Sequence, residues 1–134
     1  MKFYVREEAS KTSYSSSKEV YESIRDLNRA DQESFWVLGL NSKNKEVLRE
    51  CVSLGGINST DIDPRIVFKR LLVAGCTAFI IIHNHPSGDP KPSNEDREIT
   101  KRLRDGAKIL HLVFHDHVIV GSDQYFSFKD GGLM

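Results

Sequence analysis

Two histidines separated by a single residue stand near the middle of the chain. His83 and His85 follow an apolar run, and side chains two residues apart in a strand point to the same face, so both imidazoles can be directed at one point. Asp96 lies further along, in the first turn of an expected helix, where the helix dipole favours a carboxylate. Two histidines and one carboxylate, with a fourth position left to water, form the ligand set of a catalytic zinc site. These residues therefore predict a site in which His83, His85 and Asp96 bind one zinc ion.

Each part of this set also has an ordinary interpretation. Residues 93–96 are typical of a helix N-cap followed by an acidic first turn. An isolated His-x-His is more often a surface pair than a metal site, and a proline-rich loop by itself marks only a loop. The conjunction favours the metal site, because both histidines end a buried strand and the acidic turn follows after a short interval.

The predicted ligands need a strand, a stiff loop and a helix to hold them. Residues 77–82 are apolar on both faces, as expected for a strand in the middle of a sheet. The loop over residues 86–92 contains three prolines, which restrict its freedom and should return the chain to a fixed position. An amphipathic helix is then expected from Ser93 to about Gly106.

The remaining elements complete an α/β pattern. Ser17 is the expected N-cap of an early helix, preceded by an N-terminal arm over residues 1–17. The order of elements implies a mixed sheet with helices packed on it, and no linker divides residues 1–134, which are predicted to form one domain. We expect helices over residues 17–28 and 63–75. Strands are expected over residues 33–40, 46–54, 109–114, 118–120 and 125–128, with residues 109–114 and 118–120 as either two strands or one interrupted strand.

Composition and charge bear on several classes of protein. The 134 residues include 19 basic and 19 acidic side chains, so net charge gives no support for binding to nucleic acid or to an anionic membrane. No apolar run approaches the ~18 residues that a membrane span requires, and the start lacks the apolar core of a secretory signal. Cys51 and Cys76 are interpreted as reduced core thiols, which favours a cytoplasmic protein.

The motif resembles that of a known enzyme family. His83-x-His85, seven residues, Ser93, two residues and Asp96 match the motif of JAMM (JAB/MPN-type) metalloproteases without a gap. The segments 83–88, 116–121 and 125–128 more narrowly resemble the RadC-like branch, and the resemblance covers residues 31–134. It implies a cytidine-deaminase-like fold, a three-layer α/β/α sandwich around a mixed sheet, with one zinc ion bound by His83, His85 and Asp96.

The same resemblance implies two catalytic residues. The family uses a glutamate near the start of an early strand to hold the water at the metal, and Glu33 is the best match, with Glu46 and Glu50 as weaker candidates. Ser93 would donate a hydrogen bond to the oxyanion, which is compatible with its role as a helix cap. Asp116 and His117 are expected either to orient the metal ligands or to support the end of a strand.

The leading functional prediction is a zinc-dependent hydrolase of peptide or isopeptide bonds acting on a protein or peptide substrate. The alternative is a DNA-associated accessory or repair protein of the RadC type, although the chain lacks the helix-hairpin-helix region of longer members. An HNH nuclease is disfavoured because such enzymes spread these residues over a ββα unit. A deaminase would need His-x-Glu and Pro-Cys-x-x-Cys, which do not occur. A non-catalytic scaffold is disfavoured because all of the expected ligands are present. The oligomeric state is left open.

Overall fold

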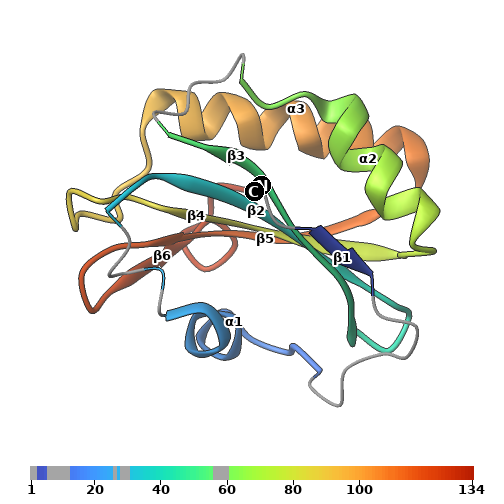
Figure 1. The fold of residues 1–134 in the computed structure, drawn as a ribbon, viewed down its shortest axis with the longest axis horizontal. Helices are drawn as coiled ribbons and strands as arrows, with labels where there is room; N and C mark the ends of the chain where they lie inside the picture. The colour runs from blue at the N-terminus through green and yellow to red at the C-terminus, as the bar shows by residue number, and fades with distance from the viewer. Residues whose placement is uncertain (1–2, 6–12, 26, 28–30, 56–60) are drawn as a thin grey trace.

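A computed structural model describes residues 3–5, 13–25, 27, 31–55 and 61–134. These residues form an α/β structure with a mixed sheet, as the sequence predicts, in the order β1, α1, β2, β3, α2, β4, α3, β5, β6 (Figure 1). The elements are β1 (Phe3–Val5), α1 (Ser17–Ile24), β2 (Ser34–Leu40), β3 (Glu46–Leu54), α2 (Pro64–Val73), β4 (Ala78–Asn84), α3 (Asn94–Leu110), β5 (Val113–Val120) and β6 (Tyr125–Ser127).

The sheet has the strand order β1-β3-β2-β4-β5-β6. Strand β4 lies near its centre, antiparallel to β2 and parallel to β5, and every residue of β4 is buried. The other neighbouring strands pair antiparallel. Because β4 and β5 are parallel, their carboxyl ends meet at the same edge of the sheet, as is typical of strands that carry functional groups.

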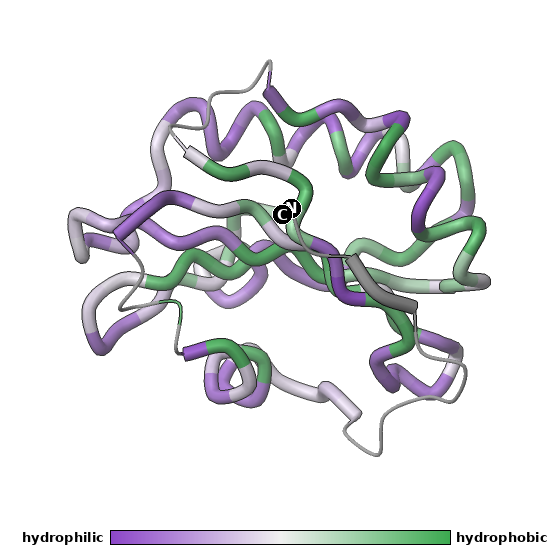
Figure 2. The backbone as a smooth tube through the Cα atoms, in the orientation of Figure 1, coloured by the Kyte–Doolittle hydropathy of each residue, from purple (hydrophilic) through white to green (hydrophobic). Residues whose placement is uncertain are grey.

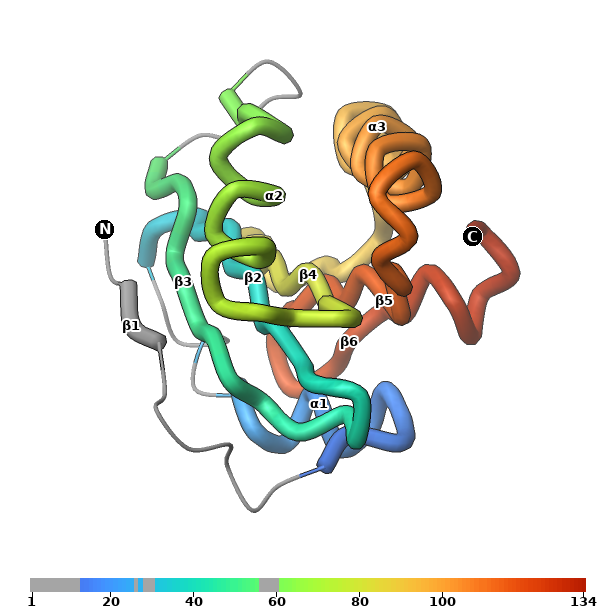
Figure 3. The backbone as a smooth tube through the Cα atoms, turned by 90° about the vertical axis from the view of Figure 1, so that its right-hand side faces the viewer, coloured from blue at the N-terminus to red at the C-terminus, as the bar shows by residue number. Residues whose placement is uncertain are grey.

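Helices cover both faces of the sheet. Figures 1 and 3 show α2 and α3 packed on one face and α1 on the other. Each face has its own core: Val67, Leu71 and Leu103 belong to the cluster under α2 and α3, whereas Val20 and Ile24 of α1 pack with β4 and β5 on the opposite side. Hydrophobic residues are concentrated in the inner strands, whereas hydrophobic and hydrophilic residues alternate along α1 and α3 (Figure 2). Burial on both faces explains why residues 78–82 of β4 are all apolar.

Of the two predicted helix N-caps, one is confirmed and one is displaced. Ser93 is the N-cap of α3, as predicted, and Asp63, the first residue of the expected second helix, is the N-cap of α2. The cap of α1 is Ser16, whose hydroxyl accepts a hydrogen bond from the Glu19 N–H, so the prediction of Ser17 is wrong by one residue. The sequence could not separate these positions, because consecutive serines offer the same capping hydroxyl.

Helix α3 is longer than predicted. It continues past Gly106 to Leu110, where His111 takes a left-handed conformation (φ 58°). Gly106 marks a close approach between helices, since a Cβ atom there would lie 2.6 Å from Cε2 of Phe68. The predicted strand start at residue 109 is therefore wrong, and β5 is one continuous strand from Val113 to Val120.

The N-terminal segment contributes to the sheet. Residues 3–5, placed in the expected arm, form β1 and pair with β3, and Ser13 forms an isolated bridge with Lys45. The expected end of the first helix at Asn28 lies outside the described residues. Cys51 and Cys76 are buried and outside any disulfide of the described residues, in line with the predicted core thiols, and burial raises the pKa of the Cys76 thiol to about 11. Within the described part of the chain, none of the helices combines the length and apolar character that crossing a membrane requires.

Candidate metal centre

Strand β4 places His83 at the edge of the sheet. The antiparallel register pairs His83 with Phe35 of β2, and the parallel register pairs it with Ile119 of β5. The His83 side chain is buried between these strands. His85 follows the end of β4, but its backbone N–H still donates to the carbonyl of Val120 (2.9 Å). The ladder therefore continues far enough to fix both histidines.

The loop after His85 is held against the turn that follows β5. Gly88 has φ 91°, its N–H donates to the His85 carbonyl (2.9 Å), and its own carbonyl accepts from the Ser122 N–H (2.9 Å). A Cβ atom on Gly121 would lie 2.3 Å from the Gly88 oxygen, so only glycine permits this approach. The expected stiffness of the loop thus has a second source besides proline, which is its contact with the turn at residues 121–122.

Asp96 reaches the histidines because it lies in a capping box. The Ser93 hydroxyl accepts from the Asp96 N–H (3.1 Å), and Oδ2 of Asp96 accepts from the Ser93 N–H (2.8 Å). The carboxylate also contacts both imidazoles, with Oδ1 3.0 Å from Nδ1 of His83 and Oδ2 3.1 Å from Nε2 of His85. The cap that begins α3 therefore also fixes the carboxylate at the site.

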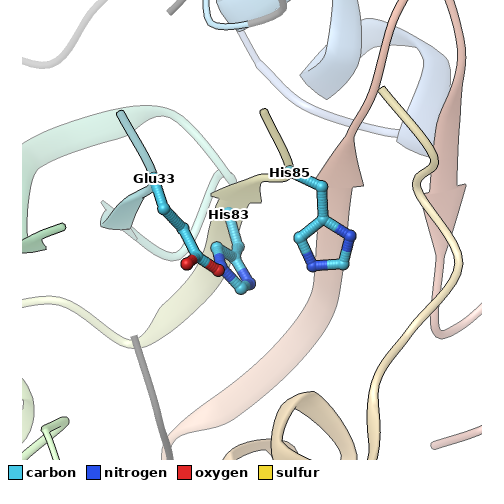
Figure 4. Close-up of side chains that lie close together, drawn as sticks. All are labelled: Glu33, His83 and His85. Carbon is cyan, nitrogen blue, oxygen red and sulfur yellow. The ribbon is translucent and has the colours of Figure 1, made fainter. Parts of the chain in front are cut away.

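Glu33 enters the site from the residue before β2. Its Oε1 lies 2.5 Å from Nε2 of His83, and Figure 4 shows the side chains of Glu33, His83 and His85 extending in the same direction. The Glu33 side chain is 22% exposed, whereas that of Asp96 is 3% exposed. Glu33 is therefore the more accessible of the two carboxylates at His83.

The other two candidate glutamates lie along β3, away from the histidines. Glu46 pairs across the sheet with Leu40, at the opposite end of β2 from the contact with His83, and binds Arg49 (2.7 Å). Glu50 pairs with Val37 and lies 3.5 Å from Arg70. Of the three glutamates, the structure brings Glu33 to the histidine pair.

His83 lies between two carboxylates, one at each ring nitrogen. Glu33, His83 and His85 form a group whose candidate ligand atoms all lie within 4.8 Å of one another. Two ligand atoms of one tetrahedral zinc ion lie about 3.3 Å apart, because the bonds are about 2.0–2.1 Å. The contacts of Asp96, at 3.0 and 3.1 Å, are nearer to this value than the 2.5 Å contact of Glu33 with His83.

A buried nitrogen at His83 also fits a metal ligand. Nδ1 of His83 faces Asp96, yet it makes no well-aligned hydrogen bond within the described residues. A buried polar atom without a hydrogen bond is costly unless another partner satisfies it. At His85, Nδ1–H donates to the carbonyl of Asp89 (2.9 Å), which leaves Nε2 to face Asp96 with its lone pair when the ring is neutral. Both imidazoles can therefore act as ligands beside Asp96.

The electrostatics favour an ionised Asp96. Burial raises the pKa of Asp96, but the contacts with His83 and His85 outweigh it and hold the pKa far below its usual range. Burial lowers the pKa values of His83 and His85, but Asp96, together with Glu33 at His83 and the Asp89 carbonyl at His85, raises both above the ordinary value. The neighbouring carboxylates therefore favour positive charge on both imidazoles, in the place where a cation would bind.

These shifts predict how pH acts on the zinc-free protein. Because the histidine pKa values are raised in the folded protein, their contribution to stability is fully present below pH 6.5, about the pKa of an unfolded histidine, and is lost as pH rises through the folded pKa. Because the pKa of Asp96 is lowered, its contribution is present above pH 3.9, about the pKa of an unfolded aspartate, and is lost only in acid. We expect the stability difference between wild type and Asp96→Asn, from urea unfolding in chelator, to be largest near pH 5–6 and to shrink toward pH 9. A difference that stays constant over this range would contradict the ionised cluster.

Asp116 and His117 have separate roles. Asp116 accepts hydrogen bonds from the Ser127 hydroxyl (2.5 Å) and from the backbone N–H groups of His117 (2.8 Å) and Lys129 (3.0 Å), so it supports the chain after β5. The His117 ring lies 6.1 Å from that of His83, and complete burial lowers the pKa of His117 to about 3. Of this pair, His117 therefore borders the site, as a neutral ring.

Thr100 connects His117 to α3 and was not predicted from the sequence. Its hydroxyl donates to the backbone carbonyl of Asp96 (2.8 Å) and lies 2.7 Å from Nδ1 of His117. Since the one hydroxyl proton is used on Asp96, Nδ1–H of His117 is the donor in the second bond. The sequence feature that could have identified Thr100 is its helical spacing of four residues from Asp96, which places both side chains on the inner side of α3.

Comparison with known proteins gives one consistent result. The profile of a family described as RadC-like JAB domain matches residues 14–133. UPF0758 proteins of Desulfitobacterium hafniense and Desulforamulus reducens are 40% identical over 111 residues and 43% identical over 115 residues, which is 83% and 86% of this chain and 49% of each relative. A UPF0758 protein of Methanosarcina mazei is 41% identical over 128 residues, covering 95% of this chain and 56% of the relative. The chain spans about half the length of the curated relatives it matches.

Proposed function

Because the chain belongs to the family of RadC-like JAB domains, we propose that it is a zinc-dependent hydrolase of peptide or isopeptide bonds. The α/β arrangement is then the cytidine-deaminase-like α/β/α sandwich of JAB/MPN proteins. The observation that carries the proposal is the convergence of Glu33, His83, His85 and Asp96 from three segments of the chain. A cytoplasmic location, suggested by the two free cysteines, is part of the same proposal.

The proposed metal ligands are His83, His85 and Asp96. Their contacts fit a shared cation, since Asp96 lies close to both imidazoles and is ionised. Bound there, zinc would lower the pKa of a bound water to about 7 and polarise the scissile carbonyl. The rigid hydrogen bonds at Ser93 and Asp89 hold two of the ligands in place.

Glu33 is the proposed general base. Its carboxylate lies beside the histidine pair and is more exposed than Asp96, so it can exchange protons with groups that enter the site. It accepts a proton from the attacking water and passes a proton to the leaving amine. Removal of the negative charge or of the carboxylate should therefore affect the reaction more than the binding of metal.

Ser93 is the proposed oxyanion donor. Its hydroxyl oxygen accepts from the Asp96 N–H, and its own proton is available to a substrate carbonyl because the side chain is exposed. We expect Ser93→Gly to reduce the cleavage rate by about 10²–10³, whereas the cost to stability should be a few tenths of a kcal/mol. Ser93→Asn, which retains a capping acceptor, is the matched control for stability. Full activity of Ser93→Gly would remove this role.

Two measurements test the proposed function. Metal analysis of the purified protein should give about one zinc per chain, and the double variant His85→Ala, Asp96→Ala should lose it. A screen of peptide and isopeptide substrates should then reveal cleavage that depends on added zinc and is absent from Glu33→Gln. Metal-free wild type, even after incubation with zinc, would refute the proposal.

A second candidate function, association with nucleic acid, has one supporting observation. Helix α3 carries four exposed basic side chains at a spacing of four, three and four residues, which places them along one side: Arg97, Lys101, Arg104 and Lys108. Glu98 and Asp105 on the same helix reduce the local positive field. A filter-binding assay with single- and double-stranded DNA over a salt series tests this candidate, and no binding at low salt would exclude it.

A further inference from the structure

Asn84 is a buried amide between the two site histidines. It is the last residue of β4, its relative exposure is 1%, and its alternation with His83 along the strand sends its side chain to the other face of the sheet. A buried amide is costly unless its donors and acceptor are paired. Its hydrogen bonds therefore indicate what the residue is for.

The Asn84 amide binds the residues on each side of Glu33. Oδ1 accepts from the backbone N–H of Ser34 (2.7 Å) and from the Ser34 hydroxyl (2.6 Å). Nδ2 donates to the backbone carbonyl of Gln32 (3.0 Å). The side chain thus pairs with the chain as a peptide group would, and it extends the contact between β4 and β2 beyond the point where β2 begins.

Two further contacts hold the same segment. The carbonyl of Glu33 accepts from the Gly55 N–H (2.8 Å), and the Ser34 hydroxyl accepts from Nε1–H of Trp36 (2.9 Å). Glu33 itself precedes β2, so these bonds replace the ladder that would fix a residue inside a strand. The backbone of Glu33 is consequently fixed at its own carbonyl and at both neighbouring residues.

We propose that Asn84 is a positioning residue that holds Glu33 beside His83, and this inference rests on the proposed role of Glu33 as the base. The link is direct in the chain, because His83 and Asn84 are consecutive. One face of β4 presents the imidazole, while the next residue fixes the segment that carries the carboxylate. Asn84 acts through the Glu33 segment and not on the substrate, because its buried side chain lies on the opposite face of the sheet from that of His83 and its amide is paired with Ser34 and Gln32. Misplacement of a reacting group by about 1 Å costs on the order of 10²-fold in rate.

The test compares Asn84→Ala and Ser34→Ala with Glu33→Gln. Ser34→Ala removes only the hydroxyl bonds and preserves the backbone bond to Asn84, so it is the milder variant if Asn84→Ala folds poorly. Co²⁺ is used in place of zinc, and we measure its affinity and the pH at which its absorption spectrum changes. We expect Asn84→Ala to bind Co²⁺ with the affinity of wild type. The pH midpoint of its absorption change should shift in the same direction as in Glu33→Gln, by at least half as much.

Cleavage of a peptide found in the screen supplies the second readout. We expect Asn84→Ala to lower kcat by about 10²-fold with little change in KM, and Ser34→Ala to lower kcat less. A role in folding alone would reduce the melting temperature but leave kcat of the folded protein and the Co²⁺ midpoint at wild-type values, and that outcome would overturn the inference. If Glu33→Gln itself retained wild-type kcat and midpoint, the proposed base would be wrong instead, so the two failures are distinguishable.

Discussion

Replacement of Glu33 by glutamine is expected to lower the cleavage rate by about 10²–10⁴ while the chain still binds one zinc ion. Glutamine preserves the size of the side chain and its contact with His83, but it cannot accept the proton. The proposed metal ligands His83, His85 and Asp96 are unchanged in this variant. The measurement is kcat on a substrate from the screen, together with zinc affinity by competition with a chromophoric chelator.

Two control variants sharpen this prediction. Glu50→Gln replaces a buried carboxylate on β3 that lies beside Arg70, and Glu46→Gln replaces one beside Arg49, so both should retain kcat in the folded protein. A loss of activity in Glu46→Gln with full activity in Glu33→Gln would reassign the base. If Glu33→Gln instead lowered zinc affinity by about 10–100-fold, Glu33 would act as the hydrogen-bond partner that orients His83. A larger loss would make Glu33 a metal ligand, as its grouping with the two histidines allows.

Zinc is expected to stabilise the wild-type fold by about 3 kcal/mol when its free concentration is one hundred times the dissociation constant. For a chain of this length, this corresponds to an increase of about 10 °C in melting temperature. The reason is that the proposed ligands are brought together only in the folded chain, from β4, the loop after it and α3. Thermal unfolding at pH 7.5, with and without zinc after removal of metal by a chelator, measures the effect.

His83→Gln should abolish the zinc-dependent part of this stabilisation. The variant loses a buried ring that contacts both carboxylates, so its zinc-free form will also be less stable than wild type. His115→Ala is the matched control, because His115 contacts Asn44 on the other side of the molecule and has no part in the proposed site. An equal increase in melting temperature for wild type and His83→Gln would show that zinc binds elsewhere.

The part of the site within one short segment could be predicted from sequence. His83 and His85 end a buried strand, and Ser93 begins a helix with an acidic first turn, so alternation and capping suffice to place them. Glu33 required the family resemblance, because an isolated glutamate before a strand is usually a solvated side chain. The register of β2 against β4 then explains its proximity, since Phe35 lies opposite His83.

The remaining features depend on contacts between distant segments. Pairing of residues 3–5 with β3 gives no strong local pattern in three residues, so β1 was not foreseen. The sequence predicts a helix end near Gly106, because it cannot show that Phe68 packs against this glycine. In the same way, the role of Asn84 becomes visible only when Gln32 and Ser34 are seen on its two sides.

The double use of the Asp96 carboxylate has a consequence for comparisons among relatives. This side chain closes the first turn of α3 through the Ser93 N–H, in addition to its contacts with the two imidazoles. A relative without the metal still benefits from a hydrogen-bond acceptor here, because the Ser93 N–H donates to this side chain at the start of α3. An aspartate at this position is therefore a poor diagnostic of catalysis in a homologue. His83 and His85 are better markers of a metal site, because their ring nitrogens that face Asp96 contact its carboxylate and do not bind the backbone.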